Sequence, residues 1–477
     1  MPDRLDIPAE EIRAIGLAAT SLIASYYDSL PERPVIVAST AAAIREAIRE
    51  PLPQEGADFD SLLATVRDVI MRFSRHNGHP RFFGYVASPG APVAAVGSMV
   101  EAALNANVTC WRSAPAGTEL ERMAIDWLKE MLGYPAGAAG LLVSGGSMAN
   151  FAALAAARSA RIPAVVREGV GAAGKRMCVY VSEEGHFSIR KAAGMLGMGE
   201  ENVRTVMTGE RLQMDAADLE RLVRADLAAG HLPLCVVANL GTTASGAVDP
   251  IGELAGVARR LGLWLHVDAA YGGFAALAPS GRPFFQHIGE ADSVTLDPHK
   301  WLYLPVGCGC VLYRDPAAAR AAFSQDAEYT RVIGLERGEA FAFWDYGPEL
   351  SRPFRSLDLW LLLKYAGARR LAKAIEGNIA CAKHLEKLAR ASADFEMLAP
   401  VELSIFCFRY APPGFAGNLD GLNERILVNL QRGGGSYLSN ARIKGKFALR
   451  GCVLNYRTTE RDMEILLDDV RRAAAAI

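Results

Sequence analysis

The residues Ser293-Val294-Thr295-Leu296-Asp297-Pro298-His299-Lys300-Trp301 lead from a short strand-forming run directly into a polar turn that carries a lysine. Burying an ammonium group costs several kcal/mol unless the charge is paired or neutralised. Desolvation also favours the neutral amine, which is the reactive form of a nucleophilic lysine. Lys300 is therefore a candidate nucleophile, unless it is a lysine that simply emerges into solvent where the strand ends.

Apolar runs of the same kind recur on both sides of this stretch, and predicted helices separate several of them. Strands that are apolar on both faces and alternate with helices indicate a mostly parallel sheet covered by helices on both sides. Ligands of such sheets bind beyond the carboxyl ends of the strands, so we expect the chemistry to follow these runs directly. The further strands are predicted at 140–143, 178–181, 234–238, 263–267 and 309–313, and the helices at 150–160, 215–228 and 251–261.

The two ends of the chain differ from this central pattern. Apolar residues recur at helical spacing near the N-terminus, and a proline-containing breaker at 30–34 ends the first helix. We expect an N-terminal helical arm at 1–85, a large domain at 86–375 and a smaller α+β domain at 376–477. The arm buries little by itself, so it must pack on the rest of its own chain or on a partner subunit. The last domain is predicted to contain strands at 401–410 and 446–450 and a helix at 460–475.

A helix is also expected just before the first strand of the sheet. Thr118 and Glu121 have the spacing of a capping box ahead of a periodic apolar run, which predicts that the helix begins at Thr118. Gly133 suits the C-terminal cap of that helix.

Composition and charge exclude several classes of protein. The 477 residues have a formal net charge of -2, which provides no basic field for binding nucleic acid. We find no run of 18 apolar residues and no signal pattern at the N-terminus, so no membrane span is expected. The eight scattered cysteines lack zinc or redox spacing, which favours buried thiols and a cytoplasmic setting. No metal site is predicted, because the histidines do not combine with acids at ligand spacing.

Three more polar features follow predicted strands. Asp268 either caps the next helix or pairs with a pyridinium nitrogen and keeps a cofactor ring protonated. The turn Ser144-Gly145-Gly146-Ser147 opens a helix, where exposed amides favour a phosphate, although such turns are often only structural. His186 is either an ordinary surface or core histidine or a flat ring that stacks on a bound pyridine.

Taken in order along the chain, these features resemble the group II pyridoxal-phosphate-dependent amino-acid decarboxylases, especially the aromatic-L-amino-acid decarboxylase branch. The resemblance extends from the helical arm to Leu449-Arg450. It implies the type I fold of pyridoxal-phosphate enzymes, which is aspartate-aminotransferase-like, in a homodimer whose active sites lie near the subunit interface and whose arms wrap around the partner. It rests on His79-Pro80-Arg81-Phe82-Phe83-Gly84-Tyr85, Trp111 through Pro115, Thr118-Glu119-Leu120-Glu121, Gly145-Gly146-Ser147, His186, Gly241-Thr242-Thr243, His266-Val267-Asp268-Ala269-Ala270-Tyr271, Pro298-His299-Lys300-Trp301 and Arg355-Ser356-Leu357.

The resemblance implies a role for each candidate residue around pyridoxal 5'-phosphate. Lys300 matches the lysine that carries the cofactor as a Schiff base, and Asp268 matches the acid paired with the ring nitrogen. His186 matches the residue stacked on the ring. The remaining matches are Gly146, Ser147 and His299 at the phosphate, Thr243 beside the phenolic edge of the ring, and Ala270 on the ring face.

Tyr329 matches a loop tyrosine that protonates the substrate carbon after carbon dioxide has left, although on local sequence alone it is an ordinary loop aromatic. In aldehyde-forming relatives the resemblance implies that this tyrosine or the stacking histidine is replaced. Both Tyr329 and His186 are present here, which favours simple decarboxylation.

The expected substrate is an aromatic amino acid: tryptophan, tyrosine, DOPA or phenylalanine. Its side-chain pocket corresponds by resemblance to positions that are smaller or more polar here than in the aromatic branch. Arg81 and Arg112 leave open an acidic or other non-aromatic substrate. The fold by itself is also compatible with an aminotransferase, an aldolase or a non-enzymatic protein. The substrate-pocket positions are Tyr85, Val86, Ser88, Asn107 and Thr109.

Overall fold

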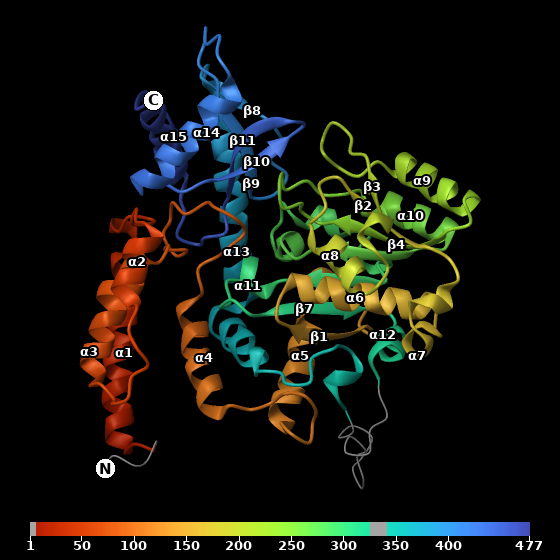
Figure 1. Cartoon of the computed structure of the whole chain (residues 1–477), viewed down its shortest axis with the longest axis horizontal. Coiled ribbons are helices and arrows are strands. Elements are labelled where there is room, and N and C mark those ends of the chain that lie inside the picture. Colours follow the sequence, from red (N-terminus) through yellow and green to blue (C-terminus); the bar gives the residue numbers. More distant parts are fainter. Residues whose placement is uncertain (1–5, 325–340) are drawn as a thin grey trace.

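The computed structural model describes residues 6–324 and 341–477. In this part of the chain, a helical arm is followed by a seven-stranded sheet flanked by helices and then by a four-stranded sheet (Figure 1). The α/β class and the mostly parallel sheet that the sequence predicted are confirmed.

The large sheet brings the ends of its parallel strands to one edge. Only β7 runs against its two neighbours, and every other neighbouring pair is parallel. The carboxyl ends of β1, β2, β4, β5 and β6 therefore point the same way. In order across the sheet, the strands are β1 (Ala139–Val143), β7 (Gly309–Tyr313), β6 (Ser293–Leu296), β5 (Trp264–Asp268), β4 (Leu232–Asn239), β2 (Met177–Ser182) and β3 (Val203–Val206).

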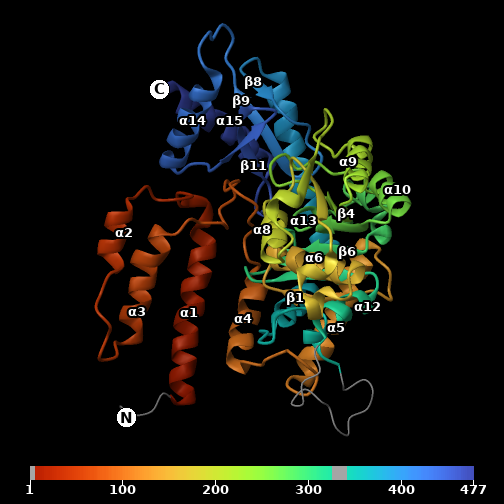
Figure 2. The same ribbon diagram turned by 45° about the vertical axis from the view of Figure 1, so that its right-hand side comes forward.

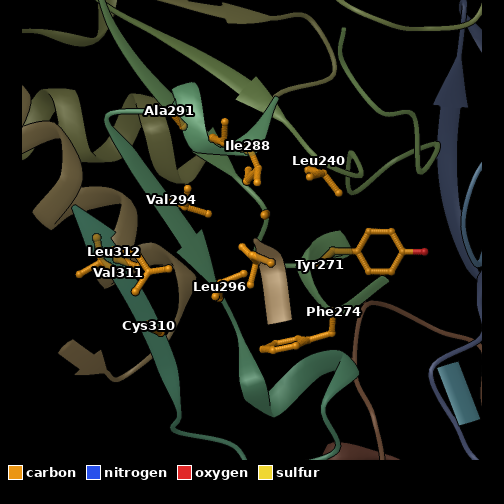
Figure 3. Packing of buried hydrophobic residues seen from close by; sticks show 14 of the residues in the cluster. Leu240, Tyr271, Phe274, Ile288, Ala291, Val294, Leu296, Cys310, Val311 and Leu312 are labelled. Atoms are coloured by element: carbon orange, nitrogen blue, oxygen red, sulfur yellow. The ribbon is translucent and has the colours of Figure 1, made fainter. Parts of the chain in front are cut away.

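Burial on both faces explains why the central strands are apolar. Every residue of β2, β5, β6 and β7 is buried. Val294 and Leu296 of β6 pack near Val311 and Leu312 of β7 and Phe274, as Figure 3 shows. The helices that cover the sheet and its ends are α5 (Pro115–Leu132), α6 (Gly146–Arg161), α8 (Ser188–Met195), α9 (Ala216–Ala228), α10 (Ile251–Leu261), α11 (Pro298–Trp301) and α12 (Pro316–Phe323).

The second sheet is small and wholly antiparallel, in the order β10-β11-β9-β8. It has a separate apolar core that includes Phe406, Phe408 and Leu466. The long helix α13 (Arg355–Ala391) connects it to the large sheet. Its other elements are β8 (Phe395–Met397), β9 (Ile405–Tyr410), α14 (Leu419–Gly433), β10 (Ser439–Ile443), β11 (Lys446–Cys452) and α15 (Glu460–Ala475).

The N-terminal arm contains α1 (Ala9–Ser29), α2 (Ala41–Ile48) and α3 (Phe59–Thr65), and it forms one edge of the molecule beside α4 (Pro92–Leu104) (Figure 2). None of the residues in α1, α2 and α3 is buried. Within the described ranges, no helix has both the length and the apolar character that a bilayer crossing needs.

Two expectations about local structure are wrong. The helix α5 begins at Pro115, so Thr118 and Glu121 lie inside it, both fully buried, and form no capping box. Proline at the first helical position starts the helix without that cap. The strand predicted at 401–410 begins only at Ile405, because the amide of Ser404 is bound by the hydroxyl of Tyr271 from the large domain.

Other expectations about local structure are confirmed or remain open. The cap at Gly133 is confirmed by its left-handed φ of 76°. Strand β3 was not predicted, because its short run has Arg204 and Thr205 at its centre. The division predicted between residues 375 and 376 falls inside α13, and the domain boundaries remain a prediction.

Glu121 instead forms a fully buried ion pair with Arg352, a residue from the segment that leads into α13. The guanidinium also donates to the carbonyl oxygens of Val108 and, at 2.8 Å, of Leu142, and it lies 4.2 Å from the ring centroid of Phe343. A carboxylate oxygen of Glu121 accepts the amide of Leu142 at 2.9 Å. This pair therefore joins α5, the end of β1 and the chain before α13.

Replacing Glu121 by Leu should destabilise the protein strongly, because it leaves the Arg352 guanidinium buried without its counter-charge. We expect a loss of about 3–5 kcal/mol in the free energy of unfolding, measured by urea denaturation. Glu119→Leu is the control, because it removes an exposed pair with Arg122 on the same helix and should cost no more than about 1 kcal/mol. Equal losses in the two variants would contradict this role of the buried pair.

Candidate active site

A pocket of about 350 Å³ lies at the edge of the large sheet where the parallel strands end. Its lining comes from the segments that follow β1, β2, β4, β5 and β6, as the strand pattern predicted. The residues that line it are Ser144, Gly145, Gly146, Ser147, Met148, Asn150, His186, Asn239, Gly241, Thr243, Asp268, Ala270, Tyr271, Asp297, His299, Lys300 and Val306.

Lys300 extends into this pocket from α11, the short helix after β6. Its Nζ lies 2.9 Å from Oδ2 of Asp297, whose side chain is almost completely buried. The other oxygen of Asp297 has no hydrogen-bond partner within the described part of the chain. The neighbouring His299 is held by its Nδ1, which lies 2.8 Å from the carbonyl oxygen of Cys308. The amine is thus both paired and open to the pocket.

Asp268 is the last residue of β5, and its carboxylate faces the same pocket. Oδ2 accepts a hydrogen bond of 2.8 Å from the side-chain amide of Asn150, and Oδ1 accepts one of 3.1 Å from the backbone amide of Ala270. Two donors on different elements therefore fix the orientation of this buried acid.

His186 follows β2 and lines the pocket on one side of β5, whereas Lys300 follows β6 on the other side of β5. Burial lowers the pKa of this imidazole below its ordinary value, and the nearby Asp268 offsets the shift only in part. Because the pKa lies below its usual value, the ring is neutral at pH 7. A neutral, flat ring is suited to stacking on an aromatic ligand.

The turn before α6 provides a backbone cradle. A Cβ at Gly146 would lie 2.8 Å from Oδ2 of Asp297 and 3.1 Å from Cβ of Ala270, so a side chain would fill the space. At Gly309 a Cβ would lie 2.8 Å from Oδ1 of the same aspartate. The first amides of α6 have no acceptor within the helix, and such amides bind phosphate groups.

The pocket brings together most of the residues that the sequence singled out. Lys300, Asp268, His186, Gly146, Ser147, Thr243, Ala270 and His299 all line it. Tyr329 lies outside the described residues. With them the structure places three polar residues to which sequence reasoning gave no role: Asn150, Asn239 and Asp297. Asp297 directly follows β6 and stands three residues before Lys300, and these two positions were the available signals for it.

The predicted side-chain pocket is not part of this cavity. Tyr85 is 51% exposed, with a left-handed φ of 58°, and Asn107 is exposed, with its side-chain oxygen accepting the amide of Arg352 at 2.8 Å. Ser88 is buried and donates to the carbonyl oxygen of His299 at 3.1 Å, which places it next to the pocket. Val86 is partly buried, and Thr109 is buried.

The two arginines considered for an acidic substrate lie elsewhere. Arg81 donates to the carbonyl oxygen of Gly435 at 3.0 Å and lies 3.7 Å from Asp462, whereas Arg112 is exposed. Neither side chain lines the pocket. Among the residues that the structure describes, no group of three or more His, Cys, Asp or Glu is arranged to hold a metal ion.

Comparisons with known proteins agree on one family. The pyridoxal-dependent decarboxylase conserved domain matches residues 42–411. The aromatic-L-amino-acid decarboxylase of Bacillus atrophaeus is 33% identical over 479 residues, covering 100% of this chain and 98% of that protein. The crystal structure of Oryza sativa TDC with PLP and tryptamine superposes with a TM-score of 0.92 at 30% identity, covering 99% of both chains. Catharanthus roseus tryptophan decarboxylase in complex with L-tryptophan gives a TM-score of 0.90 at 28% identity, covering 99% of this chain and 100% of the other.

If the turn before α6 cradles a phosphate, Gly146→Ala should weaken the binding of pyridoxal phosphate, because the added methyl group overpacks the space beside Asp297 and Ala270. Overpacking costs about 1–3 kcal/mol, which corresponds to a dissociation constant raised roughly 5- to 150-fold. Fluorescence titration of the protein with pyridoxal phosphate measures this constant. Gly137→Ala is the control, since a Cβ at Gly137 meets nothing within 4 Å; equal affinity in both variants would refute the cradle.

Proposed function

The chain belongs to the pyridoxal-dependent decarboxylase family, and on that premise we propose that the residues around the pocket convert an aromatic L-amino acid to its amine and carbon dioxide. The protein is a carboxy-lyase that uses pyridoxal phosphate. The observation that carries the assignment is the meeting of Lys300 and Asp268 in one pocket at the strand ends. Membership of this family answers the question of an aminotransferase or aldolase, which the lysine–aspartate pair alone left open.

The described pocket fits the cofactor in three respects. The glycine cradle with the first turn of α6 suits the phosphate, with Gly146, Ser147 and His299 around it. The amine of Lys300 suits the aldehyde, and the carboxylate of Asp268 suits a protonated ring nitrogen. When bound, pyridoxal phosphate supplies an electron sink for the pair left by the departing carboxylate.

The surrounding residues have separate roles in binding the cofactor ring and in placing its proton. Asp268 would hold a proton at the ring nitrogen, and its hydrogen bonds from Asn150 and Ala270 fix the orientation of the carboxylate for that role. With the cofactor bound, His186 would cover one face of the ring, and Ala270 would contact a ring face. Thr243 is exposed at the rim of the pocket, where it would lie beside the phenolic edge of the ring.

Lys300 binds the cofactor and must also gain and lose protons at its Nζ as substrate enters and product leaves. Asp297 lies 2.9 Å from this atom and can hold such a proton nearby. Tyr329 donates the proton that the substrate carbon receives in exchange for carbon dioxide. Excluding water during this step prevents a proton from solvent from adding at an atom other than the substrate carbon.

The substrate side chain would meet the five residues predicted for that task once a second copy of the chain completes the site. They are Tyr85, Val86, Ser88, Asn107 and Thr109. Tyr85 and Asn107 are exposed in the single chain, so they are available to such a shared site. The aromatic relatives named above support an aromatic side chain at this position, and they do not favour an acidic substrate or aldehyde-forming chemistry.

The second copy is the partner that the N-terminal arm requires. Ile12 is 55% exposed, Leu17 is 69% exposed and Leu62 is 49% exposed on helices in which nothing is buried. Large apolar side chains gathered on one element mark an interaction surface. A homodimer in which each arm packs on the partner would bury them and place the two pockets near the shared interface.

The free cysteines are compatible with a cytoplasmic location. All eight cysteines are free, and every one except Cys110 is buried. Burial raises the pKa of the Cys235 and Cys310 thiols, which keeps them protonated and unreactive. Proteins that work in a reducing compartment have no need of disulfides.

Lys300→Ala should abolish the visible absorbance band of the Schiff base between the cofactor and the lysine, and the release of carbon dioxide from an aromatic substrate. The assay compares L-tryptophan, L-tyrosine, L-DOPA and L-phenylalanine with L-glutamate and L-aspartate. Lys191→Ala, an exposed lysine away from the pocket, is the control and should behave as the wild type. Carbon dioxide released only from the two acidic substrates would refute the aromatic assignment. An unchanged spectrum in Lys300→Ala would refute the role of Lys300 as the residue that carries the cofactor.

The double variant Ile12→Glu and Leu17→Glu should dissociate the dimer. Burying a side chain of this size contributes about 1.5–3 kcal/mol, so its loss at two positions should raise the dimer dissociation constant at least roughly 100-fold. Sedimentation velocity over a concentration series measures this change. Arg13→Glu places a similar charge at an exposed polar position of the same helix and should leave the dimer intact; a wild type that sediments as a monomer would overturn the proposal.

A further inference from the structure

A buried polar network lies directly beneath the pocket, and the proposed function uses only its outer ends. At its centre is Asn150 in α6, which is 1% exposed. Its side-chain amide has four polar neighbours from three other elements: Asp268 and His266 of β5, Ser188 of α8 and Thr295 of β6. Every polar hydrogen in this network can be assigned from its partners.

The orientation of the Asn150 amide is fixed by Asp268. An ionised carboxylate only accepts hydrogen bonds, so the NH₂ group must face it. One N–H of Nδ2 goes to Oδ2 of Asp268 at 2.8 Å and the other to Oγ of Ser188 at 3.0 Å. Oδ1 is therefore turned the other way, where it accepts the hydroxyl of Thr295 at 2.7 Å.

His266 anchors the far side of the amide. Burial lowers the pKa of this imidazole to about 4, so it is neutral and carries one N–H. The indole of Trp264 can only donate, and it donates to Oγ of Ser293 at 2.8 Å. The hydroxyl of Ser293 is then free to donate to Nδ1 of His266 at 2.8 Å, which leaves the proton on Nε2, 3.0 Å from Oδ1 of Asn150.

The same logic fixes the tautomer of His186. The backbone amide of Ser188 donates to Nδ1 of His186 at 3.3 Å, so Nδ1 has a free lone pair. Oγ of Ser188 already accepts from Asn150, and its hydroxyl donates to the same Nδ1 at 2.8 Å. The single proton of His186 must therefore be on Nε2.

We infer that Asn150 is a positioning residue whose amide holds the carboxylate of Asp268 and, through Ser188, sets the tautomer of His186. The inference rests on the proposed function, because Asp268 and His186 are the two side chains expected to contact the cofactor ring. The Asn150 amide links them, since it donates one hydrogen bond to Asp268 and the other to Ser188, which contacts His186. His266 keeps that amide from rotating, because a flipped amide would face the N–H of His266 with its own NH₂ group.

The test reads the ring nitrogens of His186 directly. Full-length protein, purified with its cofactor and labelled with ¹⁵N in its histidine rings, is studied by solid-state NMR at pH 7, where protonated and unprotonated ring nitrogens are well separated. The signals of His186 are identified by their loss in His186→Gln. We expect an unprotonated Nδ1 and a protonated Nε2 in the wild type, and a proton on Nδ1 in the wild type would overturn the inference.

Variants then test the connection. Ser188→Ala and Asn150→Asp should each shift the tautomer equilibrium of His186 from Nε2–H alone toward Nδ1–H. The first variant removes the hydroxyl donor and the second removes the N–H that orients it, so only the longer bond of 3.3 Å from the Ser188 backbone amide remains at Nδ1. Ser188→Thr keeps a hydroxyl and should restore the wild-type signals. Ser159→Ala is the control, because Ser159 is a buried serine on the same helix as Asn150 but outside this network, and it should change nothing. Unchanged His186 signals in both Ser188→Ala and Asn150→Asp would refute the role of Asn150.

This outcome is separable from the fate of the proposed reaction. Lys300→Ala should stop decarboxylation while leaving the tautomer of His186 as it is in the wild type. If the wild type releases no carbon dioxide but shows the expected tautomers, the proposed function fails and the inference on Asn150 stands. If the wild type releases carbon dioxide but the His186 signals stay the same in Ser188→Ala and Asn150→Asp, the proposed function stands and the inference on Asn150 fails.

Discussion

A hydrogen bond of 2.8 Å between the amide of Asn150 and the carboxylate of Asp268 joins α6 to the end of β5 beneath the pocket. It satisfies a buried acid that would otherwise be costly to keep at the sheet edge. Because α6 also carries the glycine cradle at its first turn, this bond sets the distance between the two ends of the site. The lysine, the acid and the cradle can act on one ligand only if that distance is kept.

The sheet was readable from the sequence because its strands are buried on both faces and therefore uniformly apolar. The edge strand β3 lacked that signal, since Arg204 and Thr205 interrupt it. The start of α5 was misjudged for a different reason. Glu121 has the local spacing of a cap, but its partner is Arg352, which is far away in the sequence, and a local pattern contains no information about such a pair.

Some residues of the site could also be predicted from local sequence, and others could not. Lys300, Asp268 and His186 could be named in advance because each polar residue directly follows an apolar strand. Asn150 had no such signal, because an asparagine inside a helix is common. Asp297 does directly follow β6, but an acid before a proline is also common, and the lysine of the same turn drew the functional interpretation. The residues predicted for the substrate side chain were assigned by resemblance alone, and a single chain does not bring Tyr85 or Asn107 into the cavity.

The close packing of two glycines against one acid has a consequence for how such a sequence can drift. Gly146 on α6 and Gly309 on β7 face opposite oxygens of Asp297, and a methyl group at either position would lie 2.8 Å from one of them. These three positions, more than 150 residues apart at their extremes, are therefore not free to vary one at a time. A lineage that retains the aspartate must retain Gly146. Gly309 must stay a glycine even without the acid, because a methyl group there would also lie 2.5 Å from the backbone Cα of Gly145.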